Sequence, residues 1–476
     1  MADPTPMPAH AEQPIDVYVI APPTTNGPLH LGHLSGPYLA ADIVSRAARN
    51  RGDRTLTIGG VDVHPNWVLT RAENEGIDVE KLIWDFRQRI DEALFQARVN
   101  CDVYLDPQQS SHQQAVARLA AHLADNYCEF RELTLHACTD CGRTLHNSYV
   151  VGSCSRCGSH SNGGTCEGCG GYASAQDLID PRCNRCGGAP KEFQARIPVL
   201  VMEKFHAQLE ETWQRIELPR RIRDLIAGYL ADGLPEIPLG YPTNWGVEGV
   251  GSMAGLRLDV NVELGLSTYH CASTGIDPSV DSVEAERVAW EQIGKLWHFH
   301  GIDNGFYFAL LWPALYAALG VRSDQIGGTV VNEFYTLDGL KFSTSRAHAI
   351  WADELLSSQD PDIVRLYLAW DRPDRYQSDF TMAAFEDFRD WVAPLLAGTA
   401  TVPAQPAGLV TPDLIRGLDA LRAKGYDSAL AARCLLANLG SQHEPRWQLL
   451  RSAICGSTDG SSELVGAGAS SSPSGR

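Results

Sequence analysis

The chain has no run of apolar residues long enough to span a bilayer. The longest run, residues 306–321, is interrupted by Pro313 and is shorter than the roughly 20 residues that a spanning helix needs. We interpret it as a buried helix. Residues 1–14 are rich in Pro and Ala and lack the apolar segment of a secretory signal. We therefore expect a cytoplasmic protein with no membrane partner.

Basic residues are fewer than acidic ones. The 476 residues include 39 Lys+Arg and 58 Asp+Glu, which gives a formal net charge of −19. This balance argues against general coating of nucleic acid, although it does not exclude one local basic groove. With 44% hydrophobic and 20% charged residues, the composition is that of a globular protein, which excludes wholesale disorder.

The N-terminal region has the pattern of a parallel α/β sheet. Residues 15–21 form an apolar run typical of a buried parallel strand. A turn at 22–28, a helix over 29–50 and a second strand over 55–58 are predicted to follow. In such sheets, ligands bind beyond the carboxyl ends of the strands. Polar residues just after these two strands are therefore candidate site residues.

The rest of the chain alternates between helical and mixed stretches. We expect mostly helix over 70–127 and again over 204–232, and another α/β stretch over 245–340. Residues 385–396 are predicted to form one further helix. Residues 456–476 are rich in Gly and Ser, and we expect them to be disordered.

Residues 138–190 are rich in Gly and Cys and poor in large apolar side chains, so they need another means of stabilisation than hydrophobic burial. Two CxxCG turns can complete one tetrahedral four-thiolate site with no open position for a substrate. The sequence therefore predicts two structural zinc ions, with free or disulfide-linked cysteines as the alternative. The spacing leaves three pairings of the turns open. The eight cysteines are Cys138, Cys141, Cys154, Cys157, Cys166, Cys169, Cys183 and Cys186.

Two short segments have the chemistry of phosphate binding. Residues 23–33, PTTNGPLHLGH, lead from the first strand to a helix N-terminus, where anions bind readily. His30 and His33 lie about one helical turn apart, so both imidazoles can donate hydrogen bonds to phosphate oxygens. Lys341, in a loop rich in hydroxyl groups, can neutralise a departing pyrophosphate. Taken alone, either segment could equally belong to a solvated surface.

Together, HLGH at residues 30–33 and KFSTS at residues 341–345 resemble the two signature motifs of the class I aminoacyl-tRNA synthetases, and within this class those of the methionyl-tRNA synthetases. The cysteine-rich segment agrees with this, because that family carries one or two zinc knuckles between the halves of its Rossmann domain. The resemblance extends over residues 15–395.

Three shorter segments are similar to the same family. Residues 59–64, GGVDVH, resemble its G-x-D-x-H segment after the second strand. Residues 299–303, FHGID, resemble the F-x-G-K-D segment that contacts ribose. Residues 311–314, LWPA, resemble the helix that follows.

The resemblance implies an α/β fold in which a class I Rossmann domain is split by a connective insert with zinc knuckles. A stem-contact region and a short helical C-terminus would follow. The expected division is 1–14, a flexible N-terminus; 15–115, the first Rossmann half; 116–235, the insert; 236–340, the second half; 341–398, the KFSTS loop and stem-contact region; 399–455, a truncated helical region; and 456–476, a disordered tail.

The family's reaction has two steps. ATP and an amino acid form an aminoacyl-adenylate, and the aminoacyl group then moves to the 3′ acceptor end of a tRNA. The implied catalytic residues are His30, His33 and Lys341. The implied ATP-binding residues are Asn26, Gly27, Gly32, Gly301, Asp303, Ser343 and Ser345. The implied amino-acid pocket consists of Thr24, Asp62, His64, Asn261, Asn304, Phe308 and Trp312.

The resemblance also implies Mg²⁺, which would screen the phosphates of ATP. It further implies a nested pairing of the zinc ligands. We expect the chain to be a monomer. In two-knuckle relatives, one site lies inside the other along the sequence. The inner site here would be Cys154, Cys157, Cys166 and Cys169, and the outer site would be Cys138, Cys141, Cys183 and Cys186.

The side-chain pocket departs from the family. Thr24 replaces a tyrosine, and Asn261 replaces a tryptophan. Gly265 replaces a proline, Asn304 an isoleucine and Phe308 a histidine. An apolar thioether would leave the new amides unpaired, at about 1–3 kcal/mol for each unsatisfied group. We therefore expect a polar amino acid in place of methionine.

Other departures affect the loop and the C-terminal region. The second lysine of the family's K-M-S-K-S loop is Thr344 here, with Arg346 as a possible substitute. The lysine of F-x-G-K-D is Ile302, and a family arginine is absent ahead of Trp245. Few residues follow the helix predicted at 385–396, so we do not expect a full anticodon-binding helix bundle.

Three hypotheses follow. The first is a methionyl-tRNA synthetase-like ligase for methionine or for another amino acid; the intact HLGH, Asp303 and Lys341 favour this. Alternatively, it is an adenylate-forming paralogue that passes the acyl group to an acceptor other than tRNA, for example in natural product biosynthesis. The third hypothesis is a catalytically silent relative that binds RNA or protein.

Overall fold

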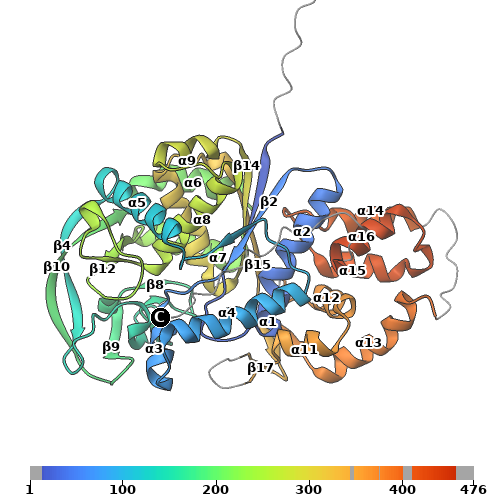
Figure 1. Ribbon diagram of the computed structural model, residues 1–476, viewed down its shortest axis with the longest axis horizontal. Helices are drawn as coiled ribbons and strands as arrows, with labels where there is room; N and C mark the ends of the chain where they lie inside the picture. Colours follow the sequence, from blue (N-terminus) through green and yellow to red (C-terminus); the bar gives the residue numbers. More distant parts are fainter. Residues whose placement is uncertain (1–12, 343–347, 375, 400–409, 457–476) are drawn as a thin grey trace, which may run out of the picture.

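The computed structural model describes residues 13–342, 348–374, 376–399 and 410–456 (Figure 1). Its centre is a sheet of parallel strands in the order β15-β14-β1-β2-β3. Their bounds are β1 (Ile15–Ile20), β2 (Thr55–Gly60), β3 (Val103–Leu105), β14 (Ile293–Gly301) and β15 (Ile326–Asn332). The order places β1 and β14 side by side in the middle, so the chain leaves the two central strands in opposite directions along the sheet.

The sheet is buried on both faces because apolar side chains alternate along β1. Val17 and Val19 belong to one hydrophobic core, while Tyr18 and Ile20 belong to the other. The first core packs against α5 (Ser110–Asn126), α8 (Val260–Ile276) and α10 (Trp312–Ala318). The second packs against α2 (Leu39–Asn50), α4 (Val79–Gln96) and α12 (Pro361–Trp370). The strands predicted at 15–21 and 55–58 are therefore confirmed.

The helix predicted over 29–50 is present with a change of pitch. It consists of α1 (Leu31–His33), the π-helical turn η1 (Leu34–Tyr38) and α2. Gly36 lies in the turn against β15, and a Cβ atom there would come within 2.7 Å of Asn332 Oδ1. Only glycine fits this close approach, which brings the end of β15 to the start of the helix.

The stretch expected to be mostly helical contains α3 (Asn66–Glu75), α4 and α5, but also the short strand β3. A three-residue strand between two helices gave no periodic signal, so the sequence missed it. The apolar run at 306–321 forms η7 (Tyr307–Leu311) and α10, both buried as predicted. Among the described residues, no helix has the length and apolar character needed to cross a membrane.

The insert is built on the long antiparallel pair β4 (Glu129–Cys138) and β10 (Pro190–Val201), with β11 (Glu236–Pro238) beside β10. Two small sheets carry the cysteine turns: β6-β5-β9 (His160–Asn162, Val150–Cys154, Leu178–Cys183) and β7-β8 (Gly164–Thr165, Tyr172–Ala173). Their hydrophobic cluster has only seven residues, as the composition predicted. The helices α6 (His206–Arg215) and α7 (Arg220–Asp232) complete the insert.

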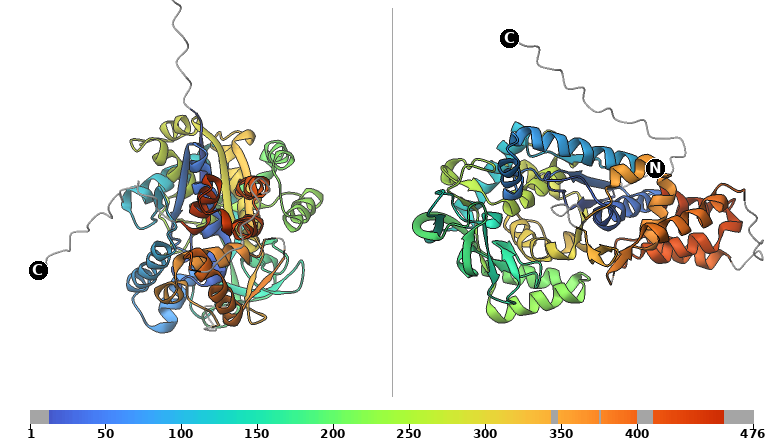
Figure 2. Two further views of the ribbon diagram at one scale, coloured as in Figure 1. Left: turned by 90° about the vertical axis from the view of Figure 1, so that its right-hand side faces the viewer. Right: turned by 90° about the horizontal axis from the view of Figure 1, so that it is seen from below.

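The C-terminal part begins with the small sheet β17-β16-β18 (Leu340–Lys341, Tyr335–Leu337, Ser378–Phe380). The helices of this part are α11 (Ala352–Ser358), α12, α13 (Met382–Leu396), α14 (Val410–Asp419), α15 (Ser428–Ala437) and α16 (Pro445–Cys455). Helices α13, α15 and α16 pack against α12. The helix predicted at 385–396 is α13. In Figure 2, the insert and these helices lie at opposite ends of the molecule, with the sheet between them.

One buried arginine joins the C-terminal helices to the sheet domain. Arg365 of α12 is fully buried and donates a hydrogen bond to Asp42 Oδ2 of α2 at 2.7 Å. It also donates to the carbonyl of Ile454 in α16 at 2.8 Å. Because a buried charge without a partner is costly, these contacts fix α16 beside α2, as Figure 1 shows.

Candidate active site and metal centres

A cavity of about 390 Å³ opens at the carboxyl ends of β1 and β14. This is the point where the strand order reverses, the usual ligand site of such sheets. Most of the residues predicted to bind substrates line it: Thr24, His30, Gly32, His33, Asp62, Asn261, Gly301, Asp303, Asn304, Phe308, Trp312 and Lys341. A larger cavity of about 570 Å³ within the insert, beside the end of α7, is lined by none of them.

The two histidines of HLGH lie together at one end of this cavity. Their rings are stacked, with centroids 3.7 Å apart and an interplanar angle of 13°. The ring of His30 also stacks on Phe342, with centroids 4.8 Å apart. A Cβ atom at Gly32 would come within 3.1 Å of the His30 ring. Any larger residue at position 32 would therefore crowd the His30 ring.

Backbone hydrogen bonds orient both rings. The His33 N–H donates to His30 Nδ1 at 3.3 Å, and the His30 N–H donates to His33 Nδ1 at 3.4 Å. A neutral imidazole that accepts at Nδ1 carries its proton at Nε2. Burial lowers the pKa of His33 to about 4, assisted by the charge of Lys341, and lowers that of His30 well below its usual range. Near neutral pH the pair therefore offers two uncharged Nε2–H donors.

Lys341 reaches the cavity from β17. Its Nζ lies 2.7 Å from Glu167 Oε2 and 4.4 Å from the centre of the Phe334 ring. The lysine is near enough to both histidines and to Asp303 to influence their pKa values. Ser343 and Ser345, predicted to bind ATP, lie outside the described residues.

Gly301 ends β14, and Asp303 follows it; both line the cavity. A Cβ atom at Gly301 would come within 2.6 Å of Asp303 Oδ1, so the absence of a side chain gives the carboxylate its position. Asp303 faces the cavity but is surrounded by protein, and this desolvation raises its pKa, although Lys341 partly opposes the shift. Its Oδ1 also accepts a long hydrogen bond of 3.4 Å from Asn304 Nδ2.

Asp62 lies after β2 and lines the same cavity. It is buried, and its Oδ1 has no hydrogen-bond partner in the described part of the chain. Burial raises the pKa of Asp62 well above its usual range, and the negative charge of Glu263 raises it further. An ammonium group entering the cavity would reverse this shift by stabilising the carboxylate.

Phe308 and Trp312 form an aromatic wall beside Asn261. Their rings lie 4.2 Å apart, and Trp312 Nε1 donates to the Asn261 carbonyl at 2.9 Å. A Cβ atom at Gly265, one turn after Asn261 in α8, would come within 3.0 Å of Trp312. Glycine thus allows α8 and α10 to pack closely and holds the indole at the cavity wall.

Three predicted residues lie elsewhere. Asn26 and Gly27 line an adjoining hollow of about 360 Å³ that also borders His30 and His33. His64 does not line the main cavity, because its Nδ1 pairs with Glu263 Oε1 at 2.6 Å. Burial opposes charging of the His64 ring, but the Glu263 carboxylate outweighs it and raises the pKa of His64.

The sequence did not identify several residues at the cavity. Glu167 enters it from the insert, and Asn332 and Glu333 enter it from the end of β15. His300 lies behind the wall, where its ring stacks on Phe308 with centroids 4.4 Å apart. His298 and His300 occupy alternate positions of β14, so a period of two just before Gly301 could have indicated them.

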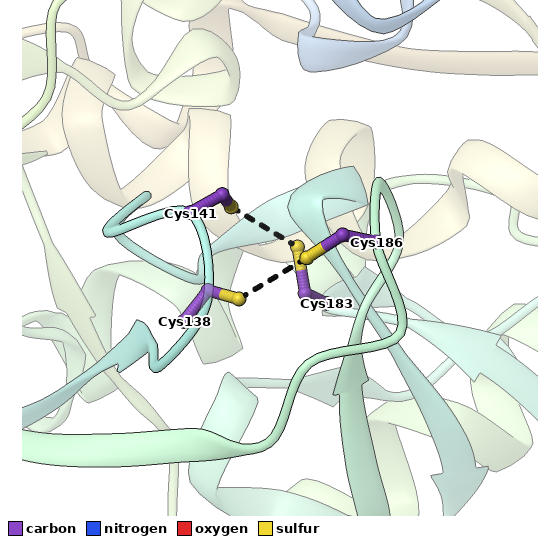
Figure 3. A group of neighbouring side chains, drawn as sticks. All are labelled: Cys138, Cys141, Cys183 and Cys186. Carbon is purple, nitrogen blue, oxygen red and sulfur yellow. Dashed lines mark hydrogen bonds between the residues drawn. The ribbon is translucent and has the colours of Figure 1, made fainter.

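The eight cysteines form two groups, each with sulfur atoms within 4.8 Å of one another. One group is Cys138, Cys141, Cys183 and Cys186, shown in Figure 3. The other is Cys154, Cys157, Cys166 and Cys169. This is the nested grouping that the resemblance implied.

Sulfur–sulfur distances support a tetrahedral metal in each group. They are 3.4 Å for Cys138–Cys186 and 3.8 Å for Cys141–Cys183. In the other group, Cys154–Cys169 and Cys157–Cys166 are 3.9 and 3.7 Å apart. A tetrahedral ion with zinc–sulfur bonds of about 2.3 Å needs thiolates about 3.8 Å apart. The donor sets therefore fit zinc.

Comparison with known proteins agrees with this architecture. The family model described as tRNA synthetases class I (M) matches residues 18–390. The chain belongs to this family. The methionine–tRNA ligase of Thermomicrobium roseum is 30% identical to this chain over 77% of its length. That of Bacillus mycoides is 25% identical over 76% of the chain.

The solved structure of Mycobacterium tuberculosis methionyl-tRNA synthetase with methionyl-adenylate has the same fold. It superposes with a TM-score of 0.64 at 16% identity, over 93% of this chain and 88% of that one. The matched regions make up 67% of the Bacillus mycoides ligase, 63% of the Thermomicrobium roseum ligase and 55% of the Methanopyrus kandleri ligase. The chain thus spans about half to two thirds of its curated relatives.

Proposed function

We propose that the chain uses ATP to activate an amino acid as its adenylate and transfers the aminoacyl group to the 3′ end of a tRNA. The supporting observation is the meeting of His30, His33, Lys341 and Asp303 at one cavity. These groups come from segments far apart in the sequence, and each suits a different part of ATP.

The histidine end would bind the triphosphate. In the first step, a carboxylate oxygen of the amino acid attacks the α-phosphorus, and the bond from that phosphorus to the leaving pyrophosphate breaks. The Nε2–H groups of His30 and His33 would donate hydrogen bonds to phosphate oxygens as charge builds up on them. Lys341 would neutralise the pyrophosphate. Fixed donors of this kind stabilise a transition state without reorganisation during the reaction.

The opposite walls would hold the ribose and the amino group. Asp303 would accept hydrogen bonds from the ribose hydroxyls, and Gly301 leaves space for the sugar. Asp62 would pair with the α-ammonium group of the amino acid. Because both carboxylates are largely desolvated, they would bind strongly to donors that satisfy them. In the second step, a tRNA hydroxyl attacks the acyl carbon and AMP leaves.

The two implied metals, zinc and Mg²⁺, would have separate roles. Zinc would be held by the two groups of four cysteines and would give the insert the stability that its small core cannot supply. Mg²⁺ would enter with ATP and screen its phosphates.

We further propose that the activated amino acid has a polar side chain. Thr24, Asn261 and Asn304 line the same cavity as the aromatic wall. A side chain that hydrogen-bonds to these groups would replace the water they lose, whereas a thioether would leave them unpaired. The aromatic faces of Phe308 and Trp312 would pack against its apolar part.

The test is amino-acid-dependent exchange of pyrophosphate into ATP, measured with each standard amino acid, Mg²⁺ and no tRNA. We expect exchange with a polar amino acid. Exchange with methionine alone would contradict the polar pocket but retain the activation step. No exchange, even after addition of total tRNA, would contradict activation and favour a catalytically silent relative.

A second acceptor has a specific observation in its favour. A hollow of about 240 Å³ adjoins the main cavity and shares Asp62 and Asp303 with it. Glu167 lines it too, and its described lining has no Lys, Arg or His. Three carboxylates favour a small cationic amine over a phosphate-bearing ligand. Labelled amino acid appearing on tRNA supports the first proposal, and an amide formed with an added amine supports the second.

A further inference from the structure

Glu167 brings the inner cysteine group to the rim of the ATP-binding end. It lies between the ligand pair Cys166 and Cys169, yet its side chain lines the main cavity and pairs with Lys341 at 2.7 Å. Lys341 belongs to β17, far away in the sequence. The ion pair therefore joins the insert to β17 across the cavity.

The backbone around Glu167 is held independently of this pair. Arg221, at the start of α7, donates hydrogen bonds to the carbonyls of Glu167 and Gly168 at 3.0 and 3.2 Å. The two flanking cysteines add a second anchor through their sulfur group. The carboxylate of Glu167 is thus presented at the cavity by a fixed turn, whereas the long side chain of Lys341 can move.

The pair itself is exposed and easily broken. The side chains of Lys341 and Glu167 are 40% and 69% exposed. Pairs of this kind stabilise a fold by at most about 1 kcal/mol. Removing the charge of Glu167 should therefore leave the fold intact. A strongly anionic ligand should be able to draw Lys341 away from it.

We propose that Glu167 is a positioning residue which holds Lys341 at the cavity rim until a triphosphate displaces it. This inference rests on the proposed function, because it assumes that ATP binds at the histidine end. A pyrophosphate group at Lys341 would compete with Glu167 for the same ammonium group. Glu167 therefore weakens ATP binding, both by competing for the lysine and by repelling the phosphates.

The experiment is isothermal titration calorimetry of Mg·ATP and of inorganic pyrophosphate with the full chain. We expect Glu167→Gln to bind both about two- to five-fold more tightly than wild type, the range expected for loss of one exposed pair. The matched control is Glu192→Gln, on β10 of the insert, where the side chain is 73% exposed. It should bind like wild type, and all variants should contain two zinc ions per chain.

A second pair of variants separates competition from repulsion. In a Lys341→Gln background, the gain from Glu167→Gln should shrink, because no lysine remains to be released. A full gain in that background, or ATP binding by Glu167→Gln that is equal to or weaker than wild type, would overturn the inference. Absence of ATP binding by every variant, wild type included, would instead contradict the proposed function.

Discussion

The ATP end and the amino-acid end of the cavity differ in how closely they follow the family pattern. At the end that we propose binds ATP, His30, His33 and Asp303 occupy the positions that the motifs predict. Backbone hydrogen bonds orient the two histidines, and Gly301 leaves room for the Asp303 carboxylate. At the amino-acid end, the wall combines Asn261 and Asn304 with aromatic rings. The two ends share one 390 Å³ cavity.

This difference shows that different constraints act on the two ends: the reaction at one end and the choice of amino acid at the other. Every activation reaction of this type breaks the same phosphoanhydride bond, so the groups around the phosphates have little freedom. The side-chain wall only has to match the amino acid, and each unpaired amide there penalises an apolar side chain. Under the proposed function, the cavity combines a retained chemistry with a changed specificity.

The largest effect should come from the histidine pair. We expect His33→Ala to lower the rate of pyrophosphate exchange by about 10²–10³, the usual cost of losing one fixed donor to a developing charge. His33→Asn keeps an N–H donor and should recover part of that loss. The control is His443→Ala, an exposed position next to α16. A loss of less than ten-fold, or an equal loss in the control, would contradict the assigned role.

A smaller effect should follow from restoring an apolar wall. Asn304→Ile introduces the residue that the family pattern has at this position, and it removes one amide from the cavity. We expect kcat/KM for the polar substrate relative to methionine to fall by about 5- to 150-fold, corresponding to about 1–3 kcal/mol. Asn126→Ile, on the exposed end of α5, should leave the ratio unchanged. An unchanged ratio in Asn304→Ile would show that Asn304 does not select the substrate.

The smallest effect concerns the histidines buried at both ends. Burial lowers the pKa of His33 and His300 to about 4 and that of His298 to about 3. The unfolded chain, with histidine pKa values near 6.5, binds more protons in this range. The free energy of unfolding should therefore rise with pH from about 4 to 6.5 and then level off.

Urea denaturation at several pH values measures this slope. His300→Gln removes one such group and should reduce the slope by up to about 1.4 kcal/mol per pH unit. His443→Gln should leave it unchanged. If the slope of His300→Gln equals that of wild type, His300 is not held neutral by the fold.

The sequence predicted which residues meet at the histidine side of the cavity because these residues lie in short motifs at strand ends. His30, Lys341 and Asp303 needed only the order of the strands to bring them together. Glu167 could not be found in this way, because its place depends on how its cysteine turn packs against Arg221 of α7 within the insert. His64 was assigned to the pocket, but it pairs with Glu263 of α8. That contact depends on how α8 packs against the loop after β2, and no local pattern encodes it.

The central claim is that the retained ATP end activates an amino acid other than methionine. Its most direct test is to incubate the chain with ATP, Mg²⁺, hydroxylamine and an equimolar mixture of the standard amino acids. Hydroxylamine attacks the acyl carbon of any adenylate, releases AMP and leaves a hydroxamate that mass spectrometry identifies. We predict that the hydroxamate of a polar amino acid predominates. Predominance of methionine hydroxamate would contradict the claim.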